Sequence, residues 1–254
     1  MARNQLVNDE QETLDKICGE LEVFQARRGY RFGIETLLLA GFVGHGAERL
    51  LDLGTGSAVL PMVLVHFGKA KSALGVEIQP RLAARACRSV EHNGLEKAIE
   101  IKTGDIRLLE QFVEPSSFDL VVSNPPYGKT GKGNTNPDGE KAIARHELLV
   151  KLSEVIRAGA RAVKVRGKFC MVIPPTRLAE TLTCCMEQRL RLSRLRLVHG
   201  RRKLAAKHCL IESVRQGKMD LVVEPPLIIY DEKGNYTDEV KSMLYPGMAR
   251  THQE

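Results

Sequence analysis

Short apolar runs alternate with longer stretches whose apolar residues recur at helical spacing along most of the chain. The short runs predict buried strands and the longer stretches predict helices. Strands are expected at 49–53, 72–77, 99–103 and 167–173, with another from Phe118 to just before Pro125; helices are expected at 34–43, 58–67, 80–93, 143–159 and 176–188, with a short one after Asp105. Strict strand–helix alternation predicts an α/β fold with a parallel, doubly wound sheet.

The two ends of the chain depart from this alternation. Residues 191–199, 207–214 and 221–230 each predict a strand, which suggests an antiparallel edge of the sheet. Residues 1–20 predict a helix or a loose arm, and 21–25 a short strand. We expect residues 1–46 to form an arm and a helix that pack on the core, and residues 47–254 to form the main domain.

Composition is that of an ordinary globular protein, with 43% hydrophobic and 27% charged residues in 254. No apolar run approaches the ~18 residues of a membrane span, and Met1 to Glu12 lack a signal or transit pattern. The six cysteines form no C-x-x-C pair and have no histidine at metal spacing. We therefore expect a cytoplasmic protein with reduced thiols and no metal.

Positive charge is concentrated in one part of the chain. Residues 151–220 hold 17 Lys and Arg against five acids, a net of +12, although the whole chain carries only +7. Such an asymmetry is typical of a polyanion partner such as nucleic acid. A solvated basic face is the alternative.

The strand that begins at Phe118 runs into Asn124-Pro125-Pro126-Tyr127 and must stop there, because proline has no N–H for the ladder. Ligands bind at the carboxyl ends of strands in an open α/β sheet. The side chain of Asn124 and the backbone carbonyls of Asn124 and Pro125 can accept both hydrogens of a planar amine, and Tyr127 can stack on its ring. A plain turn is the alternative interpretation of this tetrapeptide.

Three earlier strands also end in suggestive residues. Asp52-Leu53-Gly54-Thr55-Gly56 follows the first strand, and its glycines allow close approach of a ligand. Val59 stands where a dinucleotide-binding turn has its third glycine, so a nucleoside without phosphate fits better. Glu77 ends the second strand and can accept from ribose hydroxyls; Asp105 follows the third and can accept from an adenine amine while Ile106 packs on the ring, or can cap a helix.

Four such motifs in this order resemble the Rossmann-like, S-adenosylmethionine-dependent amino-group methyltransferases with Asn-Pro-Pro-Tyr. Further segments resemble the bacterial tRNA (adenosine-37) methyltransferases that act on valine tRNA, of the methyltransferase small domain group; they are Gln25 with Gly29-Tyr30-Arg31-Phe32, Ala144-Arg145-His146-Glu147, and Tyr236-Thr237-Asp238-Glu239. Ala58 stands where many members have a third glycine, and Glu35 where an Asp is common.

The resemblance implies a class I methyltransferase fold, with a mostly parallel seven-stranded sheet and an antiparallel edge. It implies S-adenosylmethionine as cofactor and tRNA as partner, with Asn124, Pro125 and Tyr127 as catalytic residues. The cofactor would contact Asp52, Gly54, Thr55, Gly56, Glu77, Asp105, Ile106 and Asn124. The candidate RNA-binding residues are Lys129, Lys132, Arg194, Arg196, Arg201, Arg202, Lys203 and Lys207.

Other functions remain open at this point. The same Asn-Pro-Pro-Tyr can hold a glutamine amide, as in protein methyltransferases of release factors, or an amine in ribosomal RNA or DNA. A non-catalytic RNA-binding protein on this fold is an alternative of a different class, and a nicotinamide oxidoreductase leaves Asn124 to Tyr127 unexplained. The oligomeric state is open, with a monomer favoured.

Overall fold

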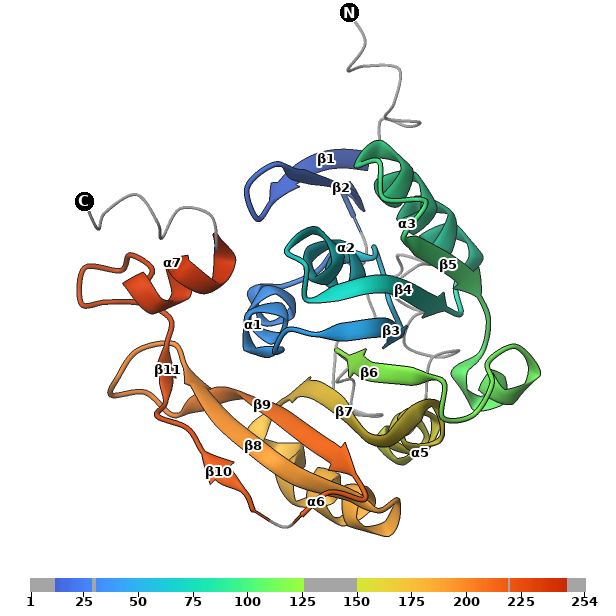
Figure 1. Ribbon diagram of the computed structural model, residues 1–254. Coiled ribbons are helices and arrows are strands. Elements are labelled where there is room, and N and C mark those ends of the chain that lie inside the picture. The colour runs from blue at the N-terminus through green and yellow to red at the C-terminus, as the bar shows by residue number, and fades with distance from the viewer. Residues whose placement is uncertain (1–11, 29–30, 126–149, 219, 246–254) are drawn as a thin grey trace, which may run out of the picture.

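A twisted mixed sheet with helices on both faces forms the body of the protein (Figure 1). The computed structural model describes residues 12–28, 31–125, 150–218 and 220–245. Five parallel strands lie side by side, namely β7 (Val163–Ile173), β6 (Phe118–Ser123), β3 (Ala47–Leu53), β4 (Ala70–Glu77) and β5 (Ile99–Thr103). The predicted parallel, doubly wound sheet is confirmed.

The antiparallel edge is confirmed as well. β9 (Ala206–Arg215) pairs antiparallel with β7, and β8 (Leu190–His199) pairs antiparallel with β9. Because β8 therefore runs in the same direction as β7, the loop from β8 to β9 lies at the edge where the parallel strands have their carboxyl ends. This places residues 200–205 at the same edge as the ends of β3, β4, β5 and β6.

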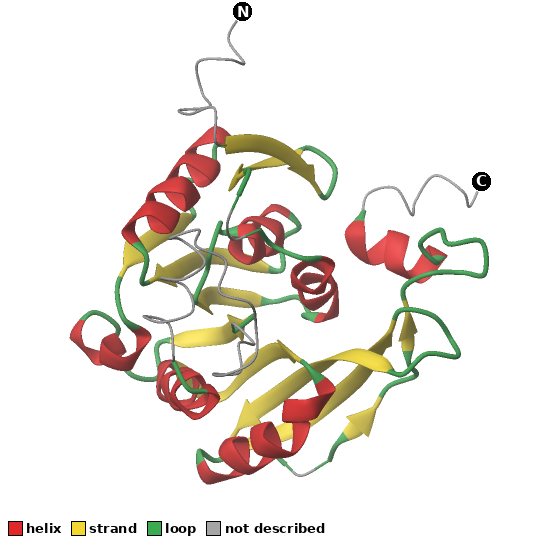
Figure 2. Ribbon diagram, turned by 180° about the vertical axis from the view of Figure 1, so that it is seen from behind, coloured by secondary structure: helices red, strands yellow, loops and turns green. Residues whose placement is uncertain are grey.

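Alternation along the strands divides the core into two layers. On β6, Leu120 and Val122 face one hydrophobic cluster while Val121 faces the other, as the twofold period of a strand requires. The first cluster includes side chains from α1 (Ile34–Phe42), α2 (Val59–His66) and α3 (Pro80–His92), and the second from α5 (Leu152–Ala162) and α6 (Leu178–Glu187). Figure 2 shows the helices on both sides of the sheet from behind.

The N-terminal segment differs from the expected helix or arm. Glu12–Ile17 is strand β1, which pairs antiparallel with β2 (Leu21–Ala26). The tight turn between them uses positive φ angles at Cys18 and Gly19. Glu12 lies beside Arg85 and Arg88 of α3, so the hairpin docks on that helix. The proposed domain boundary at residue 46 stays a prediction.

The prediction of one continuous strand at 221–230 is wrong, because only four residues of this segment are in strands. Two short strands, β10 (Val222–Val223) and β11 (Leu227–Ile228), each pair parallel with β8. Pro225 and Pro226 separate them because neither residue has an N–H to give a ladder. In the described residues the sheet thus has nine strands, the seven expected and these two.

Other elements also differ from the sequence expectation. The helix expected at 143–159 differs at both ends: it begins at Leu152, after the non-helical N-cap Lys151, and continues to Ala162, and the missing side chain of Gly159 leaves room for the ring of Phe169. β7 begins at once, at Val163 instead of Gly167, with an irregular register opposite β6. A helix not predicted, α7 (Asp238–Leu244), follows the N-cap Thr237 and packs against α1. The expected short helix after Asp105 is a 3₁₀ helix, Ile106–Gln111.

Candidate active site

A cavity of about 320 Å³ opens at the carboxyl ends of the parallel strands. Its wall combines the glycine turn, the ends of β4 and β6, and the residue after β5, as the order of the motifs predicts. The described lining residues are Arg31, Glu35, Leu53, Gly54, Gly56, Val76, Glu77, Ile78, Gln79, Leu82, Gly104, Asp105, Ile106, Ser123, Asn124, Pro125, Val150 and Val155.

The turn after β3 brings backbone to the cavity. Gly54 and Gly56 have φ angles of 75° and 59°, in the left-handed region that favours glycine. The N–H groups of Gly54 and Thr55 both donate to the carbonyl of Val76 at 2.9 Å, which ties the turn to β4. Ala58, at the N-cap of α2, has a φ of 63° and so is a third left-handed residue in this turn.

Glu77 lies in the cavity wall and holds two turns together. Its Oε2 accepts from the Gly56 N–H and its Oε1 from the Gln79 N–H, each at 3.0 Å. Burial raises the pKa of this carboxyl, and the N–H groups of Gln79 and Gly56 oppose the shift. Each oxygen keeps a second lone pair, so the group can still accept from a diol.

Asp52 lies beneath the cavity without lining it. The side chain is buried, and burial raises its pKa to about 7. Neither carboxylate oxygen has a hydrogen-bond partner among the described residues, and the same holds for the hydroxyls of Thr55 and Ser57. Thr55 is also absent from the described lining. Buried polar atoms without partners are rare in folded proteins. None of these three residues is part of the described lining, so the atoms form a polar layer beneath the glycine turn and outside the cavity wall.

Asp105 is the N-cap of the 3₁₀ helix and also lines the cavity. Its side chain accepts from the backbone N–H of Arg107 at 2.9 Å and forms an ion pair with the guanidinium at 2.6 Å. These contacts with Arg107 lower the pKa of the Asp105 carboxyl. The capping alternative is therefore confirmed, and the adenine contact of Asp105 and Ile106 stays a prediction.

The end of β6 presents Asn124 and Pro125 to the cavity. The hydroxyl of Ser123, which is fully buried, donates to the carbonyl of Leu53 at 2.8 Å and so fixes this end to the glycine turn. The Nδ2 of Asn124 donates to the hydroxyl of Thr36 on α1 at 2.9 Å. Tyr127, Lys129 and Lys132, together with Pro126 and residues 144–147, lie outside the described residues.

Arg31 and Glu35 line the cavity although the residue patterns did not single out their chemistry. Arg31 donates to the hydroxyl of Thr13 at 3.1 Å and to the carbonyl of Ala26 at 3.0 Å, and forms an ion pair with Asp15. The hairpin β1–β2 thus holds this guanidinium at the cavity. The one sequence feature that pointed to Arg31 was its segment, Gly29-Tyr30-Arg31-Phe32, which resembled a family motif. Nothing in that segment indicated which residues Arg31 would contact.

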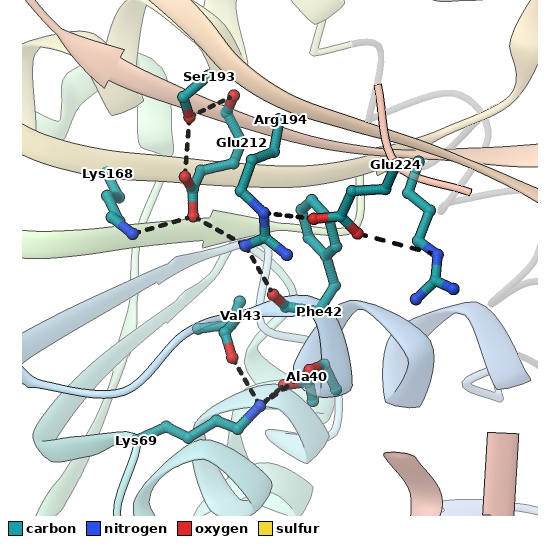
Figure 3. A network of polar contacts seen from close by, with 11 residues as sticks. Ala40, Phe42, Val43, Lys69, Lys168, Ser193, Arg194, Glu212 and Glu224 are labelled. Atoms are coloured by element: carbon teal, nitrogen blue, oxygen red, sulfur yellow. Dashed lines mark hydrogen bonds and ion pairs between the residues drawn. The ribbon is translucent and has the colours of Figure 1, made fainter. Parts of the chain in front are cut away.

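Two of the predicted RNA-binding arginines have protein partners instead. Figure 3 shows those of Arg194. Arg194 donates to Glu224 at 2.6 Å and to Glu212 at 3.3 Å, and its guanidinium lies 4.2 Å above the ring centre of Phe42. Arg196 pairs with Glu239 at 2.5 Å. These contacts weigh against a role for both arginines in RNA binding.

The other basic candidates are free of such ion pairs among the described residues. Arg201, Arg202, Lys203 and Lys207 are exposed, the first three in the loop between β8 and β9. That loop lies at the cavity's edge of the sheet, as the strand directions require. Their contact with RNA stays a prediction.

Three further properties of the described residues concern metal ligands, membrane-spanning helices and cysteines. No group of three or more His, Cys, Asp or Glu side chains in those parts of the chain could hold a metal ion. No helix there is both long and apolar enough to cross a membrane. All six cysteines are free thiols, and burial raises the pKa of four of them, Cys18, Cys170, Cys185 and Cys209, to about 11 or higher.

Comparisons with known proteins agree with this geometry. Relatives named tRNA1(Val) (adenine(37)-N6)-methyltransferase include one from Porphyromonas gingivalis W83, 28% identical over 69% of this chain and 71% of the relative, and one from a Flavobacteriaceae bacterium, 24% identical over 75% and 79%. Among solved structures, an Agrobacterium tumefaciens protein described as a predicted O-methyltransferase superposes with a TM-score of 0.65 at 23% identity, over 82% of this chain and 94% of that one. The M. capricolum protein TrmK, solved with S-adenosyl-homocysteine, gives 0.51 at 14% identity, over 77% and 72%. The sequence signature described as "Methyltransferase domain" matches residues 45–199, and the chain belongs to this methyltransferase family.

Proposed function

We propose that the protein transfers a methyl group from S-adenosylmethionine to the exocyclic amine of an adenosine in tRNA, specifically adenosine 37 of a valine tRNA. The observation that carries this proposal is the position of Asn124 and Pro125, which line the same cavity as Glu77 and Asp105. A nucleoside-binding wall and an amine-accepting corner in one cavity suit transfer between a nucleoside cofactor and an amine.

The residues of the cavity fit this cofactor in charge. S-adenosylmethionine has a cationic sulfur and an ammonium group, against a single carboxylate. The described lining has three carboxylates, on Glu35, Glu77 and Asp105, and a single guanidinium, on Arg31. In our proposal Glu77 accepts from the ribose hydroxyls and Asp105 from the adenine amine, while Gly54 and Gly56 let the ligand approach the backbone. The unpartnered Asp52 adds negative charge beneath the site when it is ionised.

The bound cofactor supplies an electrophilic methyl group on a positively charged sulfur. The chain's own part is to position the amine, whose lone pair is delocalised into the adenine ring and is therefore a poor nucleophile. Oδ1 of Asn124 and the carbonyl of Pro125 accept its two hydrogens. This contact favours a pyramidal nitrogen and directs the lone pair toward the methyl group. Tyr127 would stack on the base after it flips out of its loop.

Two observations support tRNA as the substrate. The relatives of this chain are named as tRNA methyltransferases that modify adenine 37. The exposed basic residues Arg201, Arg202 and Lys203 lie in a loop at the edge of the sheet that holds the cavity. A phosphate backbone could bind there while a base enters the cavity. Lys129, Lys132 and Lys207 are proposed as further contacts. A tRNA substrate and free thiols both fit the cytoplasm.

The substitution Asn124→Ala tests the catalytic role. We expect cofactor affinity, measured by calorimetry, to stay within about threefold, because Glu77 and the glycine turn are unchanged. Methyl transfer should fall at least ~100-fold, since removal of one positioned acceptor typically costs that much. The exposed amide of Gln111 offers a matched control, Gln111→Ala, which should keep full activity. Unchanged turnover in Asn124→Ala would overturn the proposed role.

A further inference from the structure

A hydrogen bond joins the proposed catalytic amide to a helix outside the matched family region. The Nδ2 of Asn124 donates to Oγ1 of Thr36 at 2.9 Å. Thr36 lies in the first turn of α1, whereas the family signature matches residues 45–199. Thr36 does not line the described cavity, so its hydroxyl reaches a substrate only through Asn124.

The hydroxyl of Thr36 is held in place by its surroundings. The residue is buried, and its N–H donates to the carbonyl of Gly33 at 3.2 Å. Leu38 and Leu39 of the same helix are fully buried in the core. At the other end of α1, the ammonium of Lys69 donates to the carbonyls of Ala40 and Val43 (Figure 3) and of Gly41, which caps the helix. The helix is therefore a rigid support for the hydroxyl.

The orientation of the amide decides what it can do. Nδ2 is a donor and Oδ1 an acceptor, and the two atoms lie on opposite sides of the planar group. With Nδ2 toward Thr36, Oδ1 points away from α1. If the amide rotated by 180°, it would present N–H groups to the amine of the substrate, donor against donor. The mechanism above needs the first orientation.

We propose that Thr36 is a positioning residue whose hydrogen bond with the side-chain amide of Asn124 holds that amide at the cavity, where Oδ1 can accept from the amine of the substrate. The inference depends on the proposed catalytic role of Asn124. It assigns to the N-terminal helix a part in the reaction, in addition to its packing against α2. Replacement of the hydroxyl by a methyl group removes the hydrogen bond between Nδ2 and Thr36 and so loosens the amide.

Three substitutions at this position test the role. Thr36→Val keeps the shape and removes the hydroxyl, Thr36→Ala removes it without crowding, and Thr36→Ser retains it. For Val and Ala we expect kcat to fall about 10- to 100-fold, the scale on which misoriented catalytic groups lose rate, with the Kd for S-adenosylmethionine and the KM for tRNA within about threefold of the wild type. Thr36→Ser should restore kcat to within about threefold.

The outcomes separate this inference from the proposed function. If Thr36→Val and Thr36→Ala keep the kcat of the wild type, or if Thr36→Ser loses as much as they do, Thr36 does not position the amide. A parallel fall in cofactor affinity in all three would indicate a purely structural role and would overturn the inference as well. Where Thr36→Val alone fails to fold, Thr36→Ala decides. The levels are distinguished by two further proteins. No methyl transfer to tRNA by the wild type removes the proposed function, and full activity in Asn124→Ala removes the catalytic role of Asn124. An inactive Asn124→Ala beside an active Thr36→Val removes only the role of Thr36.

Discussion

The backbone N–H of Gly56 donates a 3.0 Å hydrogen bond to Oε2 of Glu77, 21 residues further along the chain. This contact joins the turn after β3 to the end of β4. Because Oε1 accepts from Gln79 at the same distance, one carboxylate fixes two backbone turns that line the cavity. The residue proposed to recognise the ribose therefore also holds the shape of its own pocket.

The substitution Glu77→Gln should weaken cofactor binding and folding together. An amide has a single acceptor oxygen, so either the Gly56 or the Gln79 N–H would face an NH₂ group. A buried donor without a partner costs about 1–3 kcal/mol. We expect the Kd for S-adenosylmethionine to rise about 10-fold or more, and the melting temperature to fall by several degrees.

Glu100→Gln on the exposed surface of neighbouring β5 is the matched control. It makes the same chemical change without a buried partner, and both properties should stay at the values of the wild type. Cofactor affinity that is equal in Glu77→Gln and Glu100→Gln would contradict the role of Glu77.

Left-handed backbone at the glycine turn predicts that two small substitutions differ in their effect on stability. Gly54→Ala puts a side chain on a residue with φ of 75° and should destabilise the protein by about 1–2 kcal/mol. Ala58→Gly relieves the same kind of strain at φ 63° but loses a buried methyl group, so we expect a change within about 1 kcal/mol. Urea unfolding of the two variants measures both. A larger loss in Ala58→Gly than in Gly54→Ala would contradict the strain argument.

Burial of Asp52 predicts a dependence of stability on pH. Burial raises the pKa of this carboxyl to about 7, above the ordinary value of 3.8 for an aspartate. Below pH ~4 the carboxyl is protonated in both states; as the pH rises toward 7, the unfolded state loses its proton first, and stability from this group is lost. Asp52→Asn, which stays neutral, should therefore gain stability relative to the wild type as the pH rises from 4 to 8, on the order of 4 kcal/mol.

Denaturant unfolding of both proteins at pH 4, 6 and 8, without cofactor, measures the difference in their free energies of unfolding. The gap between Asp52→Asn and the wild type should widen with pH. A gap that stays constant would mean that the pKa of Asp52 is not raised in the folded protein.

Charge reversal in the loop between β8 and β9 should weaken RNA binding alone. For Arg201→Glu with Arg202→Glu, we expect tRNA affinity to fall at least ~10-fold and the slope of log K against log salt to become shallower by about 1 per lost phosphate contact. Affinity for S-adenosylmethionine should not change. Filter binding at several salt concentrations gives both quantities.

Arg157→Glu with Arg166→Glu changes the same amount of charge on α5 and in the first half of β7, where both residues are exposed. An equal loss of tRNA affinity in this control would mean that net charge, and not the loop, determines binding.

The sheet could be predicted from the sequence because each strand has a recognisable pattern within its own few residues. β3, β4, β5 and β6 are short apolar runs, and each is followed by a helix, which forces them parallel and brings their carboxyl ends together. Gly54, Glu77, Asp105 and Asn124 therefore meet at one cavity as expected. The strand β1 was missed because Glu12–Ile17 has no clear period, and its fold depends on contacts with Arg85 and Arg88, more than seventy residues away.

The sequence did not reveal which side chains form ion pairs and hydrogen bonds with one another. From composition alone, Arg194 and Arg196 are two more surface charges. In the fold they pair with Glu212, Glu224 and Glu239, which reach them only once the chain has packed. Thr36 likewise belongs to no motif, and its contact with Asn124 spans 88 positions of the chain. Such pairs follow from the fold and have no local pattern.

Methyl transfer from labelled S-adenosylmethionine into total tRNA tests the central claim most directly, with tRNA from a strain that lacks the gene and nucleosides resolved by mass spectrometry. We expect N6-methyladenosine, in valine tRNA, to appear with the wild-type protein and not with Asn124→Ala. Label in a glutamine of a protein would mean that the same site methylates a protein amide and not an adenosine. No transfer to any RNA, in a protein that binds the cofactor, would contradict the proposed activity.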